Sequence, residues 1–434
     1  MRTCRPMLAL TLGLLFHGRA SFAQQRPAAV TAGDTLFLTR AQAIALAVRA
    51  NPQIDIAREQ MLQVRAQRVQ GIAIADPVLT ASLDSLTGLH RWGAAPQRPI
   101  NLSGGVPFPD KLRLRNRVGI ANIEASESAV VLLQQQVAAQ AGRLYDSVLV
   151  VRLHQRNLLQ SRDFATEFLK RTEARFNAGT VPRLDVIKAQ VDVAQAANDL
   201  IASARDIANA DAALNRALGR TFGATLVARD SLDVPAPLPT LDAIEDVAIR
   251  VRPELRAIEA QQRGAKATTS LVRENAILPD VIVSAGRDVA VPSGIVYALG
   301  LSMPIPVFFW QHMHGDFAET HHRERELAAT YRDAQAAVAQ DVRVSYATAD
   351  AALRQVVFLR DVLLPAAREA YRVSSVSYGL GGLSALDVLD ARRTLLSAQS
   401  QYATALAAAN SSRSDLERAA GASLSSLLLG ASRE

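Results

Sequence analysis

The stretch between Lys111 and Asn177 constrains the fold of this chain more than any other feature of its sequence. It holds 67 residues without a proline. Apolar residues within it repeat at the three-and-four spacing that lines one side of a helix: Val130, Leu133, Val137, Leu144, Val148 and Val151. At 1.5 Å per residue, a helix of this length spans on the order of 100 Å. Because a compact domain of this size cannot contain such a rod, the sequence predicts an elongated, coiled-coil-like molecule.

A glycine-containing turn follows this stretch, and the same turn occurs again later in the chain. FNAGTVPRLDV at 176–186 aligns with YGLGGLSALDV at 378–388, an offset of 202 residues. Further pairs keep this register or lie within one residue of it: Gly219 with Gly421, Pro77 with Pro279, and Asn51 of NPQI with Arg252 of RPEL. One coincidental motif would not hold register so far. The chain is therefore a tandem duplication with halves of about 200 residues.

Each half has the same expected order: a helix, two strands, a very long helix, the glycine turn and a returning helix. The second long helix is expected from about Asp316 to Ser377, with a kink or break at Pro365, because proline removes a helical hydrogen bond. The returning helices, 183–217 and 384–420, are rich in alanine, which favours helix and lets neighbours approach closely.

Six segments are expected along the chain. They are a signal peptide at 1–23, a linker at 24–38, a first repeat at 39–220, a second linker at 221–240, a second repeat at 241–421 and a tail at 422–434. The helix hairpins of the two repeats are expected at about 111–217 and 316–420.

Four short segments alternate between apolar and small or polar residues, as strands do. They lie at about 78–86, 101–107, 280–287 and 296–304, and the segment from Asn101 to Val106 has the weakest pattern. Such alternation is typical of a wall between lipid and a polar lumen, and equally of a half-buried soluble hairpin. Single-chain barrels need about eight strands, so four strands can form a barrel only if several chains contribute.

The N-terminus has the pattern of a secretory signal. Arg2 and Arg5 precede an apolar run, and Ser21-Phe22-Ala23 forms a small-residue cleavage site, so we expect export. The one cysteine, Cys4, lies ahead of that run, and we therefore expect neither a lipid anchor nor a disulfide. No later apolar run approaches the roughly 18 residues of a spanning helix. A mature chain that crosses a membrane must then use strands.

Charge and motif content argue against several classes of function. Cleavage removes three arginines and no acids, so the net charge falls from +7 to +4, which is too weak and dispersed for a nucleic-acid surface. No catalytic spacing or nucleotide fingerprint occurs, and no lysine–serine phosphate cradle follows the glycines at 379–382. We expect no enzymatic activity and no cofactor.

Together these features resemble the TolC-like outer membrane efflux proteins, also called outer membrane factors. The signal peptide, the NP-x-I helix, the proline-led strand, the paired turns and GLSMPIPVF at 300–308 carry the resemblance. It implies a mainly α fold whose long antiparallel helices form a periplasmic α-barrel, with four strands per chain in a twelve-stranded outer-membrane β-barrel. It also implies a homotrimer that docks on a periplasmic adaptor and an inner-membrane pump, which we expect to be of the proton-driven resistance-nodulation-division type.

The resemblance places the two turns, with Gly179, Gly381 and Gly382, at the periplasmic tips of the helices. Asp387 and Asp390 match acidic positions that line the tunnel entrance in the family. Asp185 matches the first-half position near the gate, and Leu383 replaces an arginine that often helps to hold the entrance closed. The family's closing network is therefore not expected to carry over unchanged.

The two acids of the second turn have two interpretations. In a trimer, Asp387 and Asp390 would make a ring of six carboxylates that favours cations and raises some of their pKa values by repulsion. Alternatively, acids in a first helical turn complement the helix dipole. The dipole interpretation has equal weight for Asp185 and Asp387 and explains Asp390 less well.

A histidine cluster follows the second strand pair. It comprises His312, His314, His321 and His322, with Met313 as a further soft ligand for a transition metal. His312 and His314 are two residues apart and do not share a helix face, so we expect an exposed polar stretch rather than a metal site. VPFPDKLRLR at 106–115 resembles a segment of relatives that serve heavy-metal pumps, which favours divalent metal ions over organic drugs as cargo.

Two tryptophans flank the strand pairs. Trp92 and Trp310 are expected at the two membrane interfaces, where aromatic girdles lie, although packing in a loop is an equally ordinary role.

The leading hypothesis is an outer-membrane exit duct of a tripartite efflux pump that passes small molecules or metal ions. Two alternatives remain open at this point. One is a type I secretion channel that passes polypeptides, and the other is a periplasmic coiled-coil adaptor or scaffold without a barrel.

Overall fold

The structure is a computed structural model that describes residues 36–82, 99–220, 225–290, 294–305 and 307–424. The expected signal peptide, nearly all of the first linker, Trp92 and the tail beyond residue 424 lie outside these residues.

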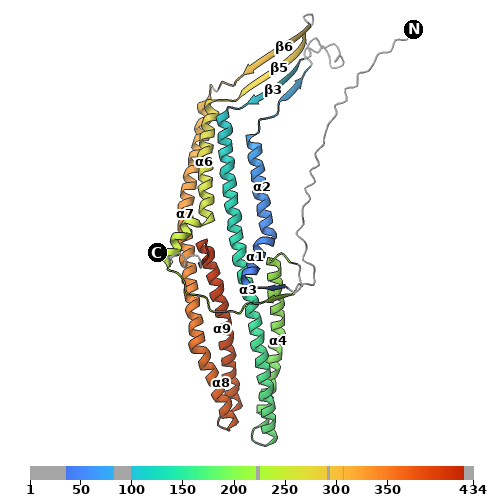
Figure 1. The fold of residues 1–434 in the computed structure, drawn as a ribbon, viewed down its shortest axis with the longest axis vertical. Coiled ribbons are helices and arrows are strands. Elements are labelled where there is room, and N and C mark those ends of the chain that lie inside the picture. The colour runs from blue at the N-terminus through green and yellow to red at the C-terminus, as the bar shows by residue number, and fades with distance from the viewer. Residues whose placement is uncertain (1–35, 83–98, 221–224, 291–293, 306, 425–434) are drawn as a thin grey trace, which may run out of the picture.

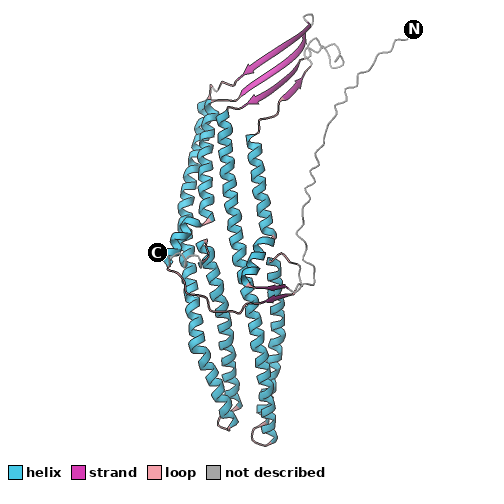
Figure 2. Ribbon diagram, viewed as in Figure 1, coloured by secondary structure: helices cyan, strands magenta, loops and turns pink. Residues whose placement is uncertain are grey.

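The molecule is a long helical rod with a four-stranded sheet at one end and two helical turns at the other (Figures 1 and 2). The helices are α1 (Arg40–Ala50), α2 (Pro52–Ile72), α3 (Pro109–Asn177), α4 (Arg183–Ala217), α5 (Leu241–Val251), α6 (Pro253–Ile277), α7 (Phe309–Phe358), α8 (Leu364–Gly379) and α9 (Ala385–Ala420). The strands are β1 (Leu36–Leu38), β2 (Val78–Ala81), β3 (Ile100–Val106), β4 (Leu226–Ala228), β5 (Val281–Ala290) and β6 (Gly294–Ser302). The expectation of long helices with four strands at the end is confirmed.

Helix α3 contains 69 residues and runs nearly the whole length of the rod. Toward the sheet it packs between α2 and α6, and α6 in turn contacts α7. Toward the turns it packs between α4 and α9, and α9 contacts α7 and α8. The absence of proline and the continuous apolar seam allow one helix to serve both layers. Among the described residues, no helix is both long and apolar enough to cross a membrane.

The counterpart of α3 in the second repeat is interrupted where Pro365 was expected to interrupt it. Helix α7 ends at Phe358, a π-helical turn covers Leu359–Leu363, and α8 begins at Leu364. Pro365 has no N–H for the preceding turn, and a wider turn relieves the clash of its ring with the carbonyl four residues earlier.

The first helix of each repeat is divided in two, which differs from the single helix expected there. Pro52 begins α2 and Pro253 begins α6, because proline fits the first helical turn but cannot continue a helix. The side chains before these prolines hold the ends of the returning helices. Asn51 Nδ2 donates to the Ala217 carbonyl at 3.2 Å, and Arg252 donates to the Ala419 carbonyl at 2.9 Å.

A small parallel sheet at the middle of the rod was not expected from the sequence. β1 pairs with β4, which lies in the segment assigned to the second linker. Tyr145 of α3 is fully buried beneath this sheet, and its hydroxyl donates to the Leu38 carbonyl at 2.8 Å. Each strand has only three residues, too short for an alternation to be recognised.

The sheet at the end of the rod is antiparallel throughout, with strand order β2-β3-β5-β6. The register brings one set of side chains to a common face, which we call the apolar sheet face: Leu79, Ala81, Ile100, Leu102, Gly104, Val106, Val281, Val283, Ala285, Arg287, Ile295, Tyr297, Leu299 and Leu301. The opposite face is mostly small or polar and includes Thr80, Asn101, Ser103, Ser284, Asp288 and Ser302. Side chains of the apolar sheet face are exposed, with Leu299 at 90%.

Candidate functional site

The turns at the end of the rod are built alike in both repeats. Gly179 has φ +72° and Gly381 has φ +86°, values that favour glycine. The amide of Thr180 donates to the Arg175 carbonyl, and the amide of Gly382, 202 residues later, donates to the Ser377 carbonyl, both at 2.9 Å. This hydrogen bond from the second residue after the C-cap is the Schellman closure of a helix end.

One aromatic residue makes the two tips unequal. Tyr378 is only 6% exposed, whereas Phe176, its partner in the duplication, is 39% exposed. The Tyr378 ring lies 5.3 Å from that of Phe168, and the Arg175 guanidinium lies 4.5 Å from its centroid. Arg175 also donates to the Tyr378 carbonyl at 2.6 Å. Tyr378 of α8 thus joins the second tip to α3 of the first repeat.

Asp387 is part of the start of α9. Its carboxylate accepts hydrogen bonds from the Ser384 amide at 2.9 Å and the Ser384 hydroxyl at 2.7 Å, which together with the reciprocal bond from the Asp387 amide to Ser384 Oγ form a capping box. These bonds lower the pKa of Asp387 below its ordinary value. A capping role therefore accounts for Asp387 within one chain.

Asp390 and Asp185 have different surroundings. Asp390 is exposed, and within the described residues its carboxylate makes no hydrogen bond or ion pair. Asp185 is half-buried in the first turn of α4, where its amide donates to the Pro182 carbonyl at 3.1 Å. Of the three acids, Asp387 is the one whose carboxylate is held by hydrogen bonds of the described residues, and Asp390 is the more exposed of the other two.

A buried arginine connects the hairpins above the tips. Arg392 of α9 forms an ion pair with Asp192 of α4, with side-chain exposures of 6% and 13%. It also donates to the carbonyl and hydroxyl oxygens of Ser161 in α3, at 2.8 and 2.6 Å. Neither partner was predicted from the sequence. The available signal was a cation one helical turn after Val388 and Leu389, on the same face that α9 buries.

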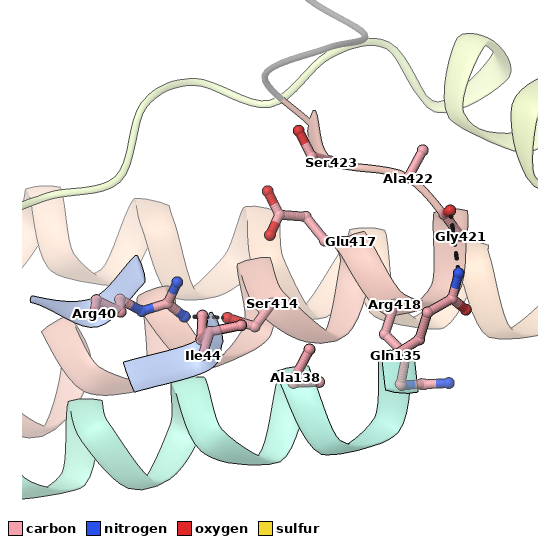
Figure 3. Close-up of a pocket in the computed structure, with 11 residues that line it drawn as sticks. Arg40, Ile44, Gln135, Ala138, Ser414, Glu417, Arg418, Gly421, Ala422 and Ser423 are labelled. Atoms are coloured by element: carbon pink, nitrogen blue, oxygen red, sulfur yellow. Dashed lines mark hydrogen bonds between the residues drawn. The ribbon is translucent and has the colours of Figure 1, made fainter. Parts of the chain in front are cut away.

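A second group of charges joins the two repeats at the middle of the rod. Arg40 forms an ion pair with Asp146 at 3.0 Å and donates to Ser414 of α9. Asp146 is 2% exposed, and burial raises its pKa despite the opposing effect of Arg40, with Asp230 raising it further. The adjoining cavity of about 240 Å³ is lined by residues of α1, α3 and α9. Within it Gln135 of α3 donates to the Gly421 carbonyl after α9 (Figure 3).

The remaining predicted site residues lie near the sheet or outside the described residues. Trp310 is 47% exposed, and its ring meets that of Phe308 edge-on at 5.7 Å, whereas Trp92 lies outside the described residues. The rings of His321 and His322 are 6.1 Å apart. His314 is exposed on α7, and the side chain of His312 is outside the description. Among the described residues, no three histidine, cysteine or acidic side chains come together as a metal site.

Comparisons with known proteins agree with this geometry. A family profile described as "Outer membrane efflux protein" matches residues 246–422, most of the second repeat. The cobalt-zinc-cadmium resistance protein CzcC of Cupriavidus metallidurans is 23% identical over 88% of this chain and 90% of that protein. The pyoverdine export outer membrane protein OpmQ of Pseudomonas aeruginosa is 26% identical over 65% of this chain and 60% of that protein.

A solved structure of CusC, described in terms of transmembrane channel formation, resembles the chain throughout. It superposes with a TM-score of 0.74 at 18% identity and covers 92% of this chain and 98% of the other. At this identity the likeness establishes the fold alone. Together, the profile over the second repeat, the relatives and the fold support the outer membrane efflux protein family, a family of channels rather than enzymes.

Proposed function

We propose that this protein is the outer-membrane exit duct of a tripartite efflux pump, through which small molecules or metal ions pass passively from the periplasm to the exterior. The observation that carries the proposal is the two-faced sheet at the end of the helical rod. Its apolar sheet face is exposed, as contact with lipid requires, and its opposite face is mostly small or polar, as suits a water-filled lumen.

Assembly follows from the edges of the same sheet. β2 and β6 each pair on one side only among the described strands, and such open edges pair readily with another chain. If β6 of one copy pairs with β2 of the next, three copies close twelve strands and leave no edge. The helical rods of a homotrimer would then enclose a periplasmic tunnel.

We propose that the tunnel is gated at its helix tips. Tyr378 and Arg175 join the two hairpins at the turns, and Arg392 joins them farther up the rod. Opening requires the hairpins to separate, so these contacts favour the closed state. Asp390, with Asp387 and Asp185 nearby, would supply the negative charge at the entrance, which favours cations.

Divalent metal ions are the cargo class that we propose to test first. CzcC is named as a cobalt-zinc-cadmium resistance protein and aligns with most of this chain, whereas OpmQ is named for pyoverdine export and aligns with less. Lys111 of the VPFPDKLRLR segment is 2% exposed and binds Asp280, the residue before β5, at 2.7 Å. This lysine therefore anchors the sheet to α3, and selectivity has to come from other residues.

Deletion of the gene tests the proposed function. We expect greater sensitivity to zinc, cobalt and cadmium, restored by the intact chain but not by one lacking 78–106. Purified protein should be a detergent-dependent trimer from the outer-membrane fraction that conducts ions in planar bilayers. It should co-purify with a periplasmic adaptor and, through it, a proton-driven pump of the resistance-nodulation-division type. A soluble periplasmic monomer would refute the duct, and loss of a secreted polypeptide without metal sensitivity would indicate a type I secretion channel.

A further inference from the structure

The apolar sheet face carries one charged side chain among its described residues. Arg287 of β5 is exposed, and the residues paired with it on this face are Ile100 of β3 and Tyr297 of β6. The neighbouring acid, Asp288, lies on the opposite face because successive strand residues alternate. Arg287 makes no hydrogen bond or ion pair within the described part of the chain.

Arg287 lies at the outer margin of the sheet. The row formed by Ala81, Ile100, Arg287 and Tyr297 is the last that joins all four strands. From Val281 to Arg287 the strand advances roughly 20 Å. At the other end of the sheet the exposed Phe308–Trp310 pair marks the margin near the helices. Figure 1 shows that β5 and β6 extend beyond the helical rod, with β5 running toward this outer margin and β6 returning from it.

The depth of this row explains how a charge is tolerated on a lipid-facing surface. Strands tilted by about 40° rise less than their length, and the apolar band of outer-membrane barrels is about 25 Å tall. Arg287 then lies roughly 15 Å above Val281, in the outer half of that band, and its long side chain can extend the guanidinium toward the headgroups. An arginine costs about 2–4 kcal/mol at the membrane midplane and only about 0–1 kcal/mol near an interface.

The chemistry of the pair favours a phosphate. A guanidinium offers parallel N–H donors that match two phosphate oxygens, and it holds its charge at all physiological pH values. Tyr297 is 75% exposed and directly opposite on β6, so its hydroxyl is available as a further donor at the level of the headgroups. The apolar residues below the pair, Leu299 and Leu301, offer a surface for acyl chains.

We propose that Arg287 and Tyr297 bind a phosphate of an outer-leaflet glycolipid, once per chain in the assembled trimer. The proposal rests on the proposed membrane insertion of the sheet. Its occupant is a lipid because the cation lies on the face that meets acyl chains, and not on the lumen face where a soluble anion would pass.

The test is lipid binding to the purified detergent-solubilised trimer, measured by native mass spectrometry with lipid A as the probe. Arg287→Gln should weaken binding on the order of tenfold, because the charge-assisted hydrogen bonds are lost. Arg287→Lys should bind lipid A more tightly than Arg287→Gln and less tightly than the original protein. The lysine ammonium supplies the charge but not the parallel N–H donors of a guanidinium. Tyr297→Phe should cause a smaller loss, and Arg58→Gln on α2 is the matched control that should bind as the original protein does.

A second arm does not depend on the folding of any variant. The unaltered trimer should prefer lipid A over its dephosphorylated form by a similar factor. Equal binding of the two lipids, or unchanged binding by Arg287→Gln, would overturn the phosphate site while leaving the duct intact. Failure of the unaltered chain to enter detergent micelles would instead refute the proposed function, and this site with it.

Discussion

The guanidinium of Arg392 in α9 pairs with the carboxylate of Asp192 in α4, although α3 lies between those helices. Both side chains are nearly removed from solvent, and Ser161 of α3 supplies two further acceptors. Charges buried in this way are stable only while their partners stay in place. The pair therefore couples the packing of three helices from both repeats.

Replacement of Arg392 by alanine should destabilise the closed arrangement. It leaves Asp192 buried without a partner, which costs about 3–5 kcal/mol. We expect a lower thermal midpoint of the trimer and a higher resting conductance in planar bilayers. Arg393→Ala is the matched control, because Arg393 is adjacent and exposed. Unchanged conductance in a folded Arg392→Ala trimer would contradict a role in closure.

Tyr378 should matter through its ring and its backbone rather than its hydroxyl. The hydroxyl lies 3.4 Å from that of Thr172, at the limit of a hydrogen bond, so Tyr378→Phe should behave as the original protein does. Tyr378→Ala removes a buried aromatic side chain, at a cost of about 3 kcal/mol, and should increase hydrogen exchange in both turns. Phe176→Ala is the control. An equal increase in hydrogen exchange for this variant would contradict the conclusion that the two tips are packed differently.

The glycines of the second turn should differ in their tolerance of alanine. Gly381 has φ +86° and open space around it, so Gly381→Ala should cost about 1–2 kcal/mol through backbone strain alone. Gly379 is helical and equally open, so Gly379→Ala should be neutral or stabilise by up to about 1 kcal/mol. The thermal midpoints of the two variants test this prediction. Equal shifts would argue against a requirement for glycine at the left-handed φ of Gly381.

Asp387 and Asp390 should separate in their effects on ion selectivity and on stability. Asp390→Asn should reduce the preference for cations, read from reversal potentials, while Asp387→Asn should mainly weaken the start of α9. Hydrogen bonds from Ser384 lower the pKa of Asp387, so its stabilising effect is present above the unfolded pKa and is lost as pH falls through the folded pKa.

Ser384→Ala tests this assignment. It should raise the pKa of Asp387 toward its ordinary value, so that the capping contribution is lost at a higher pH than in the original protein. Identical pH profiles of the two proteins would show that the capping box has no effect on this carboxylate.

The pKa of Asp146 is raised, whereas that of Asp387 is lowered, so the two groups should affect stability in opposite ways as pH changes. Burial raises its pKa above the ordinary 3.8, so the folded state holds this proton more tightly than the unfolded state. The stability linked to this group is present below the unfolded pKa and is lost as pH rises through the raised folded pKa. Relative to Asp146→Asn, the original protein should lose thermal stability over that range. Asp206→Asn, an exposed carboxylate on α4, should show no such difference.

Much of the architecture follows from local patterns. The proline-free run sets the length of α3, Pro365 interrupts its counterpart, and the paired glycine turns establish the duplication. These features depend on neighbouring residues: helix hydrogen bonds span four residues, and a left-handed φ concerns one. The resemblance to outer membrane efflux proteins likewise rests on motifs that are contiguous in sequence.

The sites depend on tertiary structure because they join residues far apart in the chain. Arg392 lies 200 residues from Asp192, and Arg175 lies 203 from the Tyr378 carbonyl that it binds. No local pattern pairs such residues, because the pairing depends on how the repeats pack around α3.

The sheet also combines features that are visible in the sequence with features that depend on tertiary structure. Alternation within each strand was visible in the sequence, but the register between strands decides which faces coincide. A slip of one residue would move every apolar side chain to the other face. The sequence alone thus determined a duplicated rod of helices with four strands. Only the packing of its halves decided that one sheet face is apolar, that Tyr378 is buried while Phe176 is exposed, and that Arg287 is the sole described charge on that apolar face.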